Sequence, residues 1–241
     1  MISENERVLL SGEKREFFVR AHDKELSTDK GIIKLSELIG MNSGDIIYTH
    51  LNKPFKVIVP RPVDYYSYAK RTGAPMPPKD IGMVIAYTGM NKKDVVLEAG
   101  TGSAVATIYF GNIAEKVVSY EKREEFSAVC KKNIEDAGLL NVEVIAGDIL
   151  QAEGLYDIVH LDMQIEKEHV LHAHSLLKSG GYLSTYTPFL EQTFCVMDAA
   201  EGLFSEVVCH ELIEREISRT ERGTRPSTRV CHTGYITICR K

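Results

Sequence analysis

The pattern of hydrophobic and polar residues divides the chain into two parts. Before residue 60, short apolar runs at residues 17–20, 31–35, 44–49 and 54–60 are separated by Gly, Asn and Pro. This spacing is typical of strands in a small sheet or barrel-like module. A helix is predicted to follow Pro60, and the proline-rich residues 73–80 are predicted to form an extended loop that cannot be helical. We therefore expect a β-rich module over residues 1–60 and a linker over residues 61–80.

After residue 80, strand and helix patterns alternate. The predicted helices cover residues 81–87, 104–110, 124–137 and 169–177, and the predicted strands cover residues 94–97, 116–120, 142–146, 157–161 and 181–186. Such alternation indicates an α/β fold in which helices cover both faces of a mostly parallel sheet. We expect this domain to span residues 81–241.

The composition fits this organisation. The 241 residues, 44% of them hydrophobic and 26% charged, suffice for one α/β domain with a small additional module. No apolar run approaches the roughly 18 residues of a membrane span, and the first residues lack a signal-peptide pattern, so we expect a cytoplasmic location. The five cysteines form no C-x-x-C pair, which disfavours a zinc knuckle or disulfide framework. The net charge of −5 argues only weakly against a nucleic-acid partner, because a local basic surface can coexist with it.

The segment Val95-Val-Leu-Glu-Ala-Gly-Thr-Gly-Ser-Ala104 joins a predicted strand to a predicted helix. Its two glycines let the backbone approach a ligand, and the following helix start offers free N–H groups. The acid Glu98 stands two residues before the first glycine. The predicted cofactor contacts in this segment are Glu98, Gly100, Thr101, Gly102 and Ser103.

Two more acids follow the next two predicted strands. Glu121 is placed to accept the hydroxyls of a ribose, and Asp148 is placed to meet an adenine amino group. A dinucleotide such as NAD would require a third glycine at position 105, which is Val105, and Glu98 would repel its pyrophosphate. The spacing therefore favours S-adenosylmethionine (SAM) as the cofactor.

Histidines offer a competing metal interpretation. Four of them lie close together in the sequence, at positions 160, 169, 172 and 174. Their spacing matches no zinc-hydrolase pattern, so we predict no metal.

The motifs together resemble the TrmI family of tRNA (adenine-N1)-methyltransferases. The segments that carry the resemblance are Asp29-Lys-Gly-Ile-Ile, Arg61-Pro-Val-Asp-Tyr-Tyr, Lys70-Arg-Thr-Gly, Pro78-Lys-Asp, Leu97-Glu-Ala-Gly-Thr-Gly-Ser, Ser119-Tyr-Glu, Tyr186-Thr-Pro-Phe-Leu-Glu-Gln, Arg225-Pro and His232-Thr-Gly-Tyr-Ile. The resemblance implies a class I SAM-dependent methyltransferase with a Rossmann-like sheet, acting as a homotetramer on tRNA. Its expected reaction is methylation of N1 of the T-loop adenosine at tRNA position 58.

The resemblance also assigns roles to particular residues. Asp162, after the predicted strand 157–161, stands where the family keeps its catalytic aspartate. Lys79, Arg225 and His232 fall on family motifs as candidate substrate contacts.

Two other functions remain open at this point. Residues 163–168 contain no proline and two glutamates, whereas the family has a proline-containing stretch there. This departure, like the Ala104 that replaces a usual glycine, keeps open a methyltransferase of the same lineage with another RNA site or a small molecule as substrate. A non-catalytic SAM- or tRNA-binding subunit is the third hypothesis, although such a subunit would be expected to carry a degraded cofactor loop.

Overall fold

The computed structural model describes residues 1–228 and 231–241, which form two compact units. The first unit comprises Met1–Ala69 with Glu135–Gly138, and the second comprises Lys70–Ile134 with Leu139–Lys241. Within the described residues, no helix is both long and apolar enough to cross a membrane.

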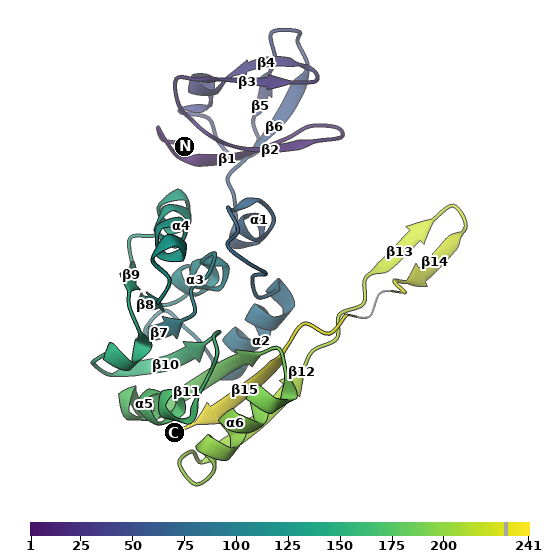
Figure 1. Ribbon diagram of the computed structural model, residues 1–241. Coiled ribbons are helices and arrows are strands. Elements are labelled where there is room, and N and C mark those ends of the chain that lie inside the picture. Colours follow the sequence, from purple (N-terminus) through teal and green to yellow (C-terminus); the bar gives the residue numbers. More distant parts are fainter. Residues whose placement is uncertain (229–230) are drawn as a thin grey trace. The chain divides into compact units, whose positions relative to one another are not determined.

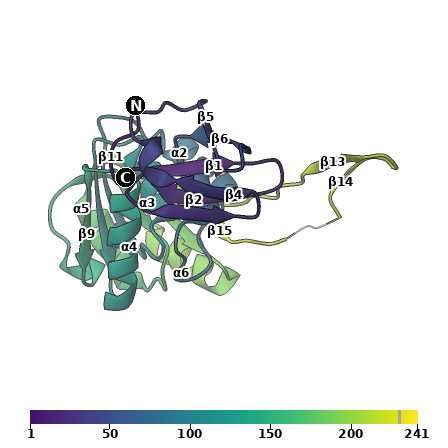
Figure 2. The same ribbon diagram turned by 90° about the horizontal axis from the view of Figure 1, so that it is seen from above.

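The first unit is built from short antiparallel strands. Its larger sheet has the order β2-β1-β6-β5, formed by β1 (Arg7–Ser11), β2 (Glu16–Arg20), β5 (Ile46–Tyr48) and β6 (Pro54–Ile58) (Figure 1, Figure 2). A second pair joins β3 (Glu25–Thr28) to β4 (Gly31–Lys34), and the short 3-10 turn η1 (Leu35–Leu38) follows. Alternate residues such as Val8, Leu10 and Val57 are fully buried in this unit's own core. Helix α1 (Pro62–Tyr68) ends the unit.

The second unit contains a seven-stranded sheet of order β12-β15-β11-β10-β7-β8-β9. Its strands are β7 (Val95–Ala99), β8 (Lys116–Glu121), β9 (Val142–Ala146), β10 (Tyr156–Leu161), β11 (Leu177–Thr187), β12 (Glu206–Glu211) and β15 (Tyr235–Arg240). The pairs among β7 to β11 are parallel, and β15 runs antiparallel to both of its neighbours. The predicted α/β class with a mostly parallel sheet is therefore confirmed.

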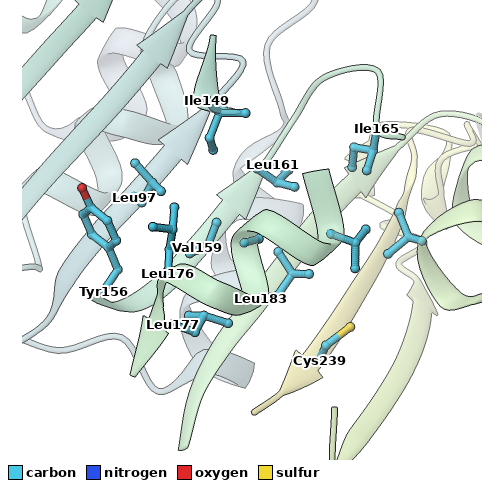
Figure 3. Packing of buried hydrophobic residues seen from close by; sticks show 14 of the residues in the cluster. Leu97, Ile149, Tyr156, Val159, Leu161, Ile165, Leu176, Leu177, Leu183 and Cys239 are labelled. Carbon is cyan, nitrogen blue, oxygen red and sulfur yellow. The ribbon is translucent and has the colours of Figure 1, made fainter. Parts of the chain in front are cut away.

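Helices cover both faces of this sheet (Figure 1). They are α2 (Pro78–Thr88), α3 (Val105–Gly111), α4 (Glu124–Asp136), α5 (Lys167–Leu176) and α6 (Leu190–Ala200), with the 3-10 turn η2 (Ile149–Gln151). Successive strand residues point to opposite faces, so Leu97, Val159 and Leu183 pack in one cluster with residues of α5 and α6 (Figure 3). Glu98 points to the other face, where it contacts Thr107 of α3.

Some element boundaries differ from the sequence prediction. Pro78, Lys79 and Asp80 were expected in an extended loop but form the first turn of α2, because a proline at the first helical position loses no hydrogen bond. Leu177 was expected to end the helix 169–177, and residues 178–180 to precede the strand 181–186, but residues 177–180 form the beginning of β11. A side chain at Gly181 would come within 2.7 Å of the Asp157 carbonyl oxygen, so this glycine allows close strand approach.

Other elements have no counterpart in the prediction from hydrophobic pattern. These are β1, β3, α6, β12, β15 and the exposed hairpin of β13 (Ile217–Thr220) and β14 (Gly223–Pro226). Short strands rich in charged and polar residues, such as β13 and β14, lack the apolar alternation that pattern analysis requires.

The ends of β7 and β10 approach so closely that only glycine fits at position 100. Gly100 has φ +86°, and a Cβ atom on it would overlap the backbone carbonyl of Asp162. We expect Gly100→Ala to lower the free energy of unfolding by about 3 kcal/mol or more in urea denaturation. The matched control is Gly89→Ala at the end of α2, where φ is +65° and no atom lies within 4 Å of the added methyl group. That variant is expected to lose only about 1 kcal/mol, and equal losses for the two variants would contradict the close-approach argument.

Candidate cofactor and substrate site

The carboxyl ends of the parallel strands meet at one edge of the sheet. The backbone N–H of Asp162 donates to the carbonyl of Ala99 at 2.9 Å, and the N–H of Gly100 donates to the carbonyl of Tyr120 at 3.0 Å. The N–H of Gly147 likewise donates to the carbonyl of Glu121 at 3.1 Å. These bonds hold four strand ends together, and ligands of open α/β sheets bind at this edge.

The loop after β7 has an unusual backbone. Gly100 and Gly102 have positive φ angles of +86° and +54°, which glycine adopts without strain. Ala104, just before α3, also has a positive φ of +61° although it carries a buried methyl group. This left-handed position explains why a glycine suits it better, and an alanine there costs about 1 kcal/mol of backbone strain.

Glu98 lies beneath this loop and is only 2% exposed. Its Oε2 accepts hydrogen bonds from the hydroxyls of Thr107 at 2.6 Å and Ser119 at 2.7 Å. Burial raises the pKa of Glu98 to about 7, although the two hydroxyls oppose that shift. Glu98 also lines a cavity of about 260 Å³ together with Gly100, Thr101, Gly102 and Ser103. A buried acid facing a cavity in this way favours a cationic ligand.

Glu121 ends β8 and is held by its neighbours. Its Oε2 accepts from the N–H of Gly102 at 2.9 Å, and Arg123 donates to both carboxylate oxygens at 2.8 and 3.1 Å. Burial alone would raise the pKa of Glu121, but the hydrogen bonds from Arg123 and Gly102 outweigh it, so its pKa is lowered. The guanidinium of Arg123 also lies 3.8 Å from the ring centroid of Phe126. Glu121 is therefore ionised. Arg123 donates to the same two carboxylate oxygens that would accept hydrogen bonds from a ribose diol.

Asp148 follows β9 and lines a second cavity, of about 600 Å³, with Glu121 and Gly147. Its carboxylate accepts from the N–H of Leu150 at 3.0 Å and from Lys122 at 2.9 Å. These two bonds lower the pKa of Asp148.

Asp162 stands at the junction of the two cavities. Gly100, Arg123 and Asp162 are the residues that line both of them. The Asp162 carboxyl is half-buried, and burial together with the charge of Glu98 raises its pKa to about 7. A carboxyl group that titrates near neutral pH can accept either a hydrogen bond or a proton from a ligand at this junction.

The segment after Asp162 leads directly into α5. Met163, Gln164 and Glu166 line the second cavity. Glu166 caps α5, because its backbone N–H donates to Nδ1 of His169 at 2.9 Å, and Glu168 lies in the first helical turn. Acids at the start of a helix interact favourably with its dipole. The two glutamates thus have a local role in starting α5.

Lys79, Arg225 and His232, the predicted substrate contacts, do not line either cavity. Lys79 uses its ammonium group within the protein: it donates to Asp80 at 2.6 Å, to the carbonyl of Leu212 at 2.6 Å and to Thr233 at 2.8 Å. His232 contacts Glu211 and the Pro188 carbonyl at 2.8 and 3.0 Å, while Arg225 lies exposed in β14. Their contact with substrate stays a prediction, and the structure gives Lys79 a role in holding the segment around Thr233.

Several cavity residues were missed from the sequence. Arg123, Phe126 and the segment Thr72–Met76 line the first cavity. The position of Arg123 two residues after Glu121 was a usable signal, because the two side chains emerge together where β8 ends. Residues 72–76 were predicted only as part of the linker and of the family motif Lys70-Arg-Thr-Gly, because a segment without helix or strand has no periodicity that indicates where its side chains point.

The described part of the chain contains no group of three or more His, Cys, Asp or Glu side chains arranged to hold a metal ion. His160 is fully buried, and its Nδ1 lies 2.8 Å from the Ser184 hydroxyl. Burial lowers the pKa of His160 to about 4, so the ring is neutral.

The residues present fit SAM. The two cavities together have the size of a nucleoside-sized ligand site. Glu98, Glu121, Asp148 and Asp162 surround the cavities with acids, which suits a ligand bearing ammonium and sulfonium charges and disfavours a pyrophosphate. This strand order, with a glycine loop after β7 and acids after β8, β9 and β10, defines a class I SAM-dependent methyltransferase.

Comparisons with known proteins agree with this class. Residues 78–183 match the family described as ribosomal RNA adenine dimethylase. The chain is 32% identical to a tRNA (adenine(57)-N(1)/adenine(58)-N(1))-methyltransferase TrmI of Methanocaldococcus jannaschii, covering 97% of this chain and 94% of that protein. A SAM-dependent O-methyltransferase from Thermotoga maritima superimposes with a TM-score of 0.86 at 29% identity, covering 100% of this chain and 94% of that one. The tRNA (m1A58) methyltransferase TrmI of Aquifex aeolicus gives a TM-score of 0.80 at 25% identity, with 100% and 98% covered.

The chain belongs to the TrmI family of SAM-dependent tRNA (adenine-N1)-methyltransferases. The family that the sequence motifs indicated is thereby confirmed.

The raised pKa of Glu98 predicts a pH-dependent stability. The carboxyl titrates at about 7 in the folded chain against 4.5 ordinarily, so its favourable contribution is complete below pH 4.5 and is lost as the pH rises through 7. We expect Glu98→Gln, which can still accept both hydroxyls, to be more stable than wild type at pH 8 by about 3 kcal/mol and similar at pH 4.5. Urea denaturation at both pH values measures this difference. A difference that does not change with pH would show that folding does not raise the pKa of Glu98.

Proposed function

We propose that this protein transfers the methyl group of SAM to N1 of the adenosine at position 58 of tRNA. The observation that carries the proposal is the position of Asp162, a carboxyl of raised pKa at the junction of two cavities that the predicted cofactor contacts also line. The resemblance of the whole chain to tRNA (adenine-N1)-methyltransferases supports the same substrate.

Each acid has a separate task in this proposal. Glu121 would accept the ribose hydroxyls, Asp148 the adenine amino group, and Glu98 with residues 100–103 would hold the methionine end. SAM supplies a methyl group on a sulfonium, which the N1 lone pair attacks in line as the carbon–sulfur bond breaks and its electrons pass to sulfur. Because N1 already has a lone pair, the protein must mainly orient the base. Asp162 would hold the exocyclic amino group of the target adenine and accept its proton as positive charge develops on the ring.

We also propose that the protein acts as a homotetramer, as the family resemblance implies, and in the cytoplasm, as the sequence pattern indicates. Phe189, Phe194, Ile213 and Ile217 of the second unit are each more than half exposed, and association would cover apolar surface of this kind.

A second candidate is a methyltransferase of the same lineage with another acceptor. The structural likeness to an O-methyltransferase favours it, as do the residues 163–168, which lack the family's prolines. In this case the protein would bind SAM and leave the tRNA adenosine unmodified.

The first test is the reaction itself. Purified protein with tritiated SAM and an unmodified tRNA transcript should yield 1-methyladenosine, detected by nucleoside mass spectrometry. A transcript with guanosine at position 58 should lose the product, whereas a guanosine at position 57 should leave it. SAM binding without any 1-methyladenosine would favour the second candidate.

Asp162→Asn tests the proposed catalytic residue. The amide keeps the shape of the side chain but cannot accept a proton, so we expect kcat to fall about a hundredfold. The KM for SAM should change less than about twofold, because Asp162 faces the target base in this proposal. Wild-type activity should rise as the pH passes through about 7, where Asp162 ionises, and the variant should lack this rise. A variant with full activity would remove Asp162 from the mechanism.

A further inference from the structure

A short segment between α1 and α2 covers part of the cofactor cavity. We refer to residues 70–76 as the strap. Its residues Thr72–Met76 line the first cavity beside the glycine loop, and Met76 is only 2% exposed. The strap contains no helix or strand, so regular backbone hydrogen bonds do not set its position. Other contacts must hold it against the cavity.

One side chain joins the strap to the glycine loop. Asn133 lies on the inner face of α4, is 3% exposed, and donates through Nδ2 to the carbonyl of Lys70 and to the carbonyl of Ser103, both at 2.9 Å. Both hydrogens of the amide are therefore used. A buried amide is costly unless it is paired in this way.

The same two segments meet again through a hydroxyl. The Ser103 Oγ accepts from the N–H of Thr72 at 2.9 Å and lies 3.2 Å from the Thr72 hydroxyl. Ser103 thus contacts the strap through its side chain while its carbonyl contacts Asn133. The strap, the glycine loop and α4 are fixed to one another at the wall of the cavity.

We propose that Asn133 is a positioning residue for the cofactor: it holds the strap over the glycine loop, so that the strap encloses the methionine end of SAM and slows its release. This inference rests on the proposed placement of the cofactor in the cleft. The buried face of α4 also carries Ser127, Cys130 and Ile134, and Asn133 is the residue on it that bonds to two other segments. A residue with only a packing role at position 133 would need no amide.

The test compares cofactor release in matched variants. Asn133→Asp has the same shape but its carboxylate cannot donate to either carbonyl, and Asn133→Ala removes the bridge. We expect both variants to release SAM about tenfold faster in stopped-flow displacement, the effect of losing one to two net hydrogen bonds. The KM for SAM should rise to a similar extent, and kcat should change less than about twofold.

Asn141→Ala is the control. Asn141 also donates through Nδ2 to backbone carbonyls, those of Gly111 at 2.9 Å and Ala114 at 3.1 Å, but it lines neither cofactor cavity. The Asn141→Ala variant should have a lower melting temperature, as the Asn133 variants should, but it should release SAM at the wild-type rate.

Trypsin gives a readout that is independent of catalysis. Lys70 and Arg71 are exposed at the start of the strap. SAM should protect these sites in the wild type, and the protection should be weaker in Asn133→Ala. Release rates and protection equal to wild type in folded Asn133 variants would overturn the inference. A wild-type protein that binds no SAM at all would instead overturn the proposed function, and this inference with it.

Discussion

The close approach of two backbone segments, at Gly100 and Asp162, sets the geometry of the site. With no side chain at position 100, the end of β10 can lie directly against the end of β7, and the N–H of Asp162 bonds to the Ala99 carbonyl. The same approach places the Asp162 carboxyl beside the glycine loop. Any side chain at position 100 would separate the residue proposed for catalysis from the loop proposed to hold the cofactor, so cofactor binding and chemistry depend on the same backbone contact.

Around this contact the site concentrates negative charge that the fold must tolerate. Glu98 and Asp162 both line the first cavity; burial and the charge of Glu98 raise the pKa of Asp162, and burial and the charge of Glu121 raise the pKa of Glu98. Arg123 offsets part of this charge by binding Glu121. The repulsion among these acids lowers the stability of the protein without a ligand, and a bound cation would offset it. Binding sites commonly show such a trade-off between stability and function.

The sequence carried different amounts of information about different parts of the molecule. The parallel core was predictable because β7, β8 and β10 are apolar runs followed by glycines and acids, and these same residues form the cleft. Asn133 and the strap were not predicted, because Asn133 depends on contacts with segments distant in the sequence and the strap has no periodicity. Arg123 was missed although it lies only two residues after Glu121. The hairpin β13–β14 and the strand β15 were missed or known only by resemblance. A polar exposed ribbon such as β13–β14 has no apolar pattern. The position of the antiparallel strand β15 is determined by its pairing with β11. The beginning of β11 at residues 177–180 was missed, because glycine is common both after a helix and at points of close strand contact.

The acids that surround the cleft also bear on how a reaction cycle ends. In the proposed reaction, methyl transfer would turn a sulfonium into an uncharged thioether, so the spent cofactor would lose the charge that Glu98 and Asp162 are proposed to attract, while the methylated base would gain one. The electrostatic attraction of the cleft for the cofactor would then weaken at the moment of transfer, without any movement of the protein. Carboxyl groups placed in this way would favour exchange of the spent cofactor for a fresh one.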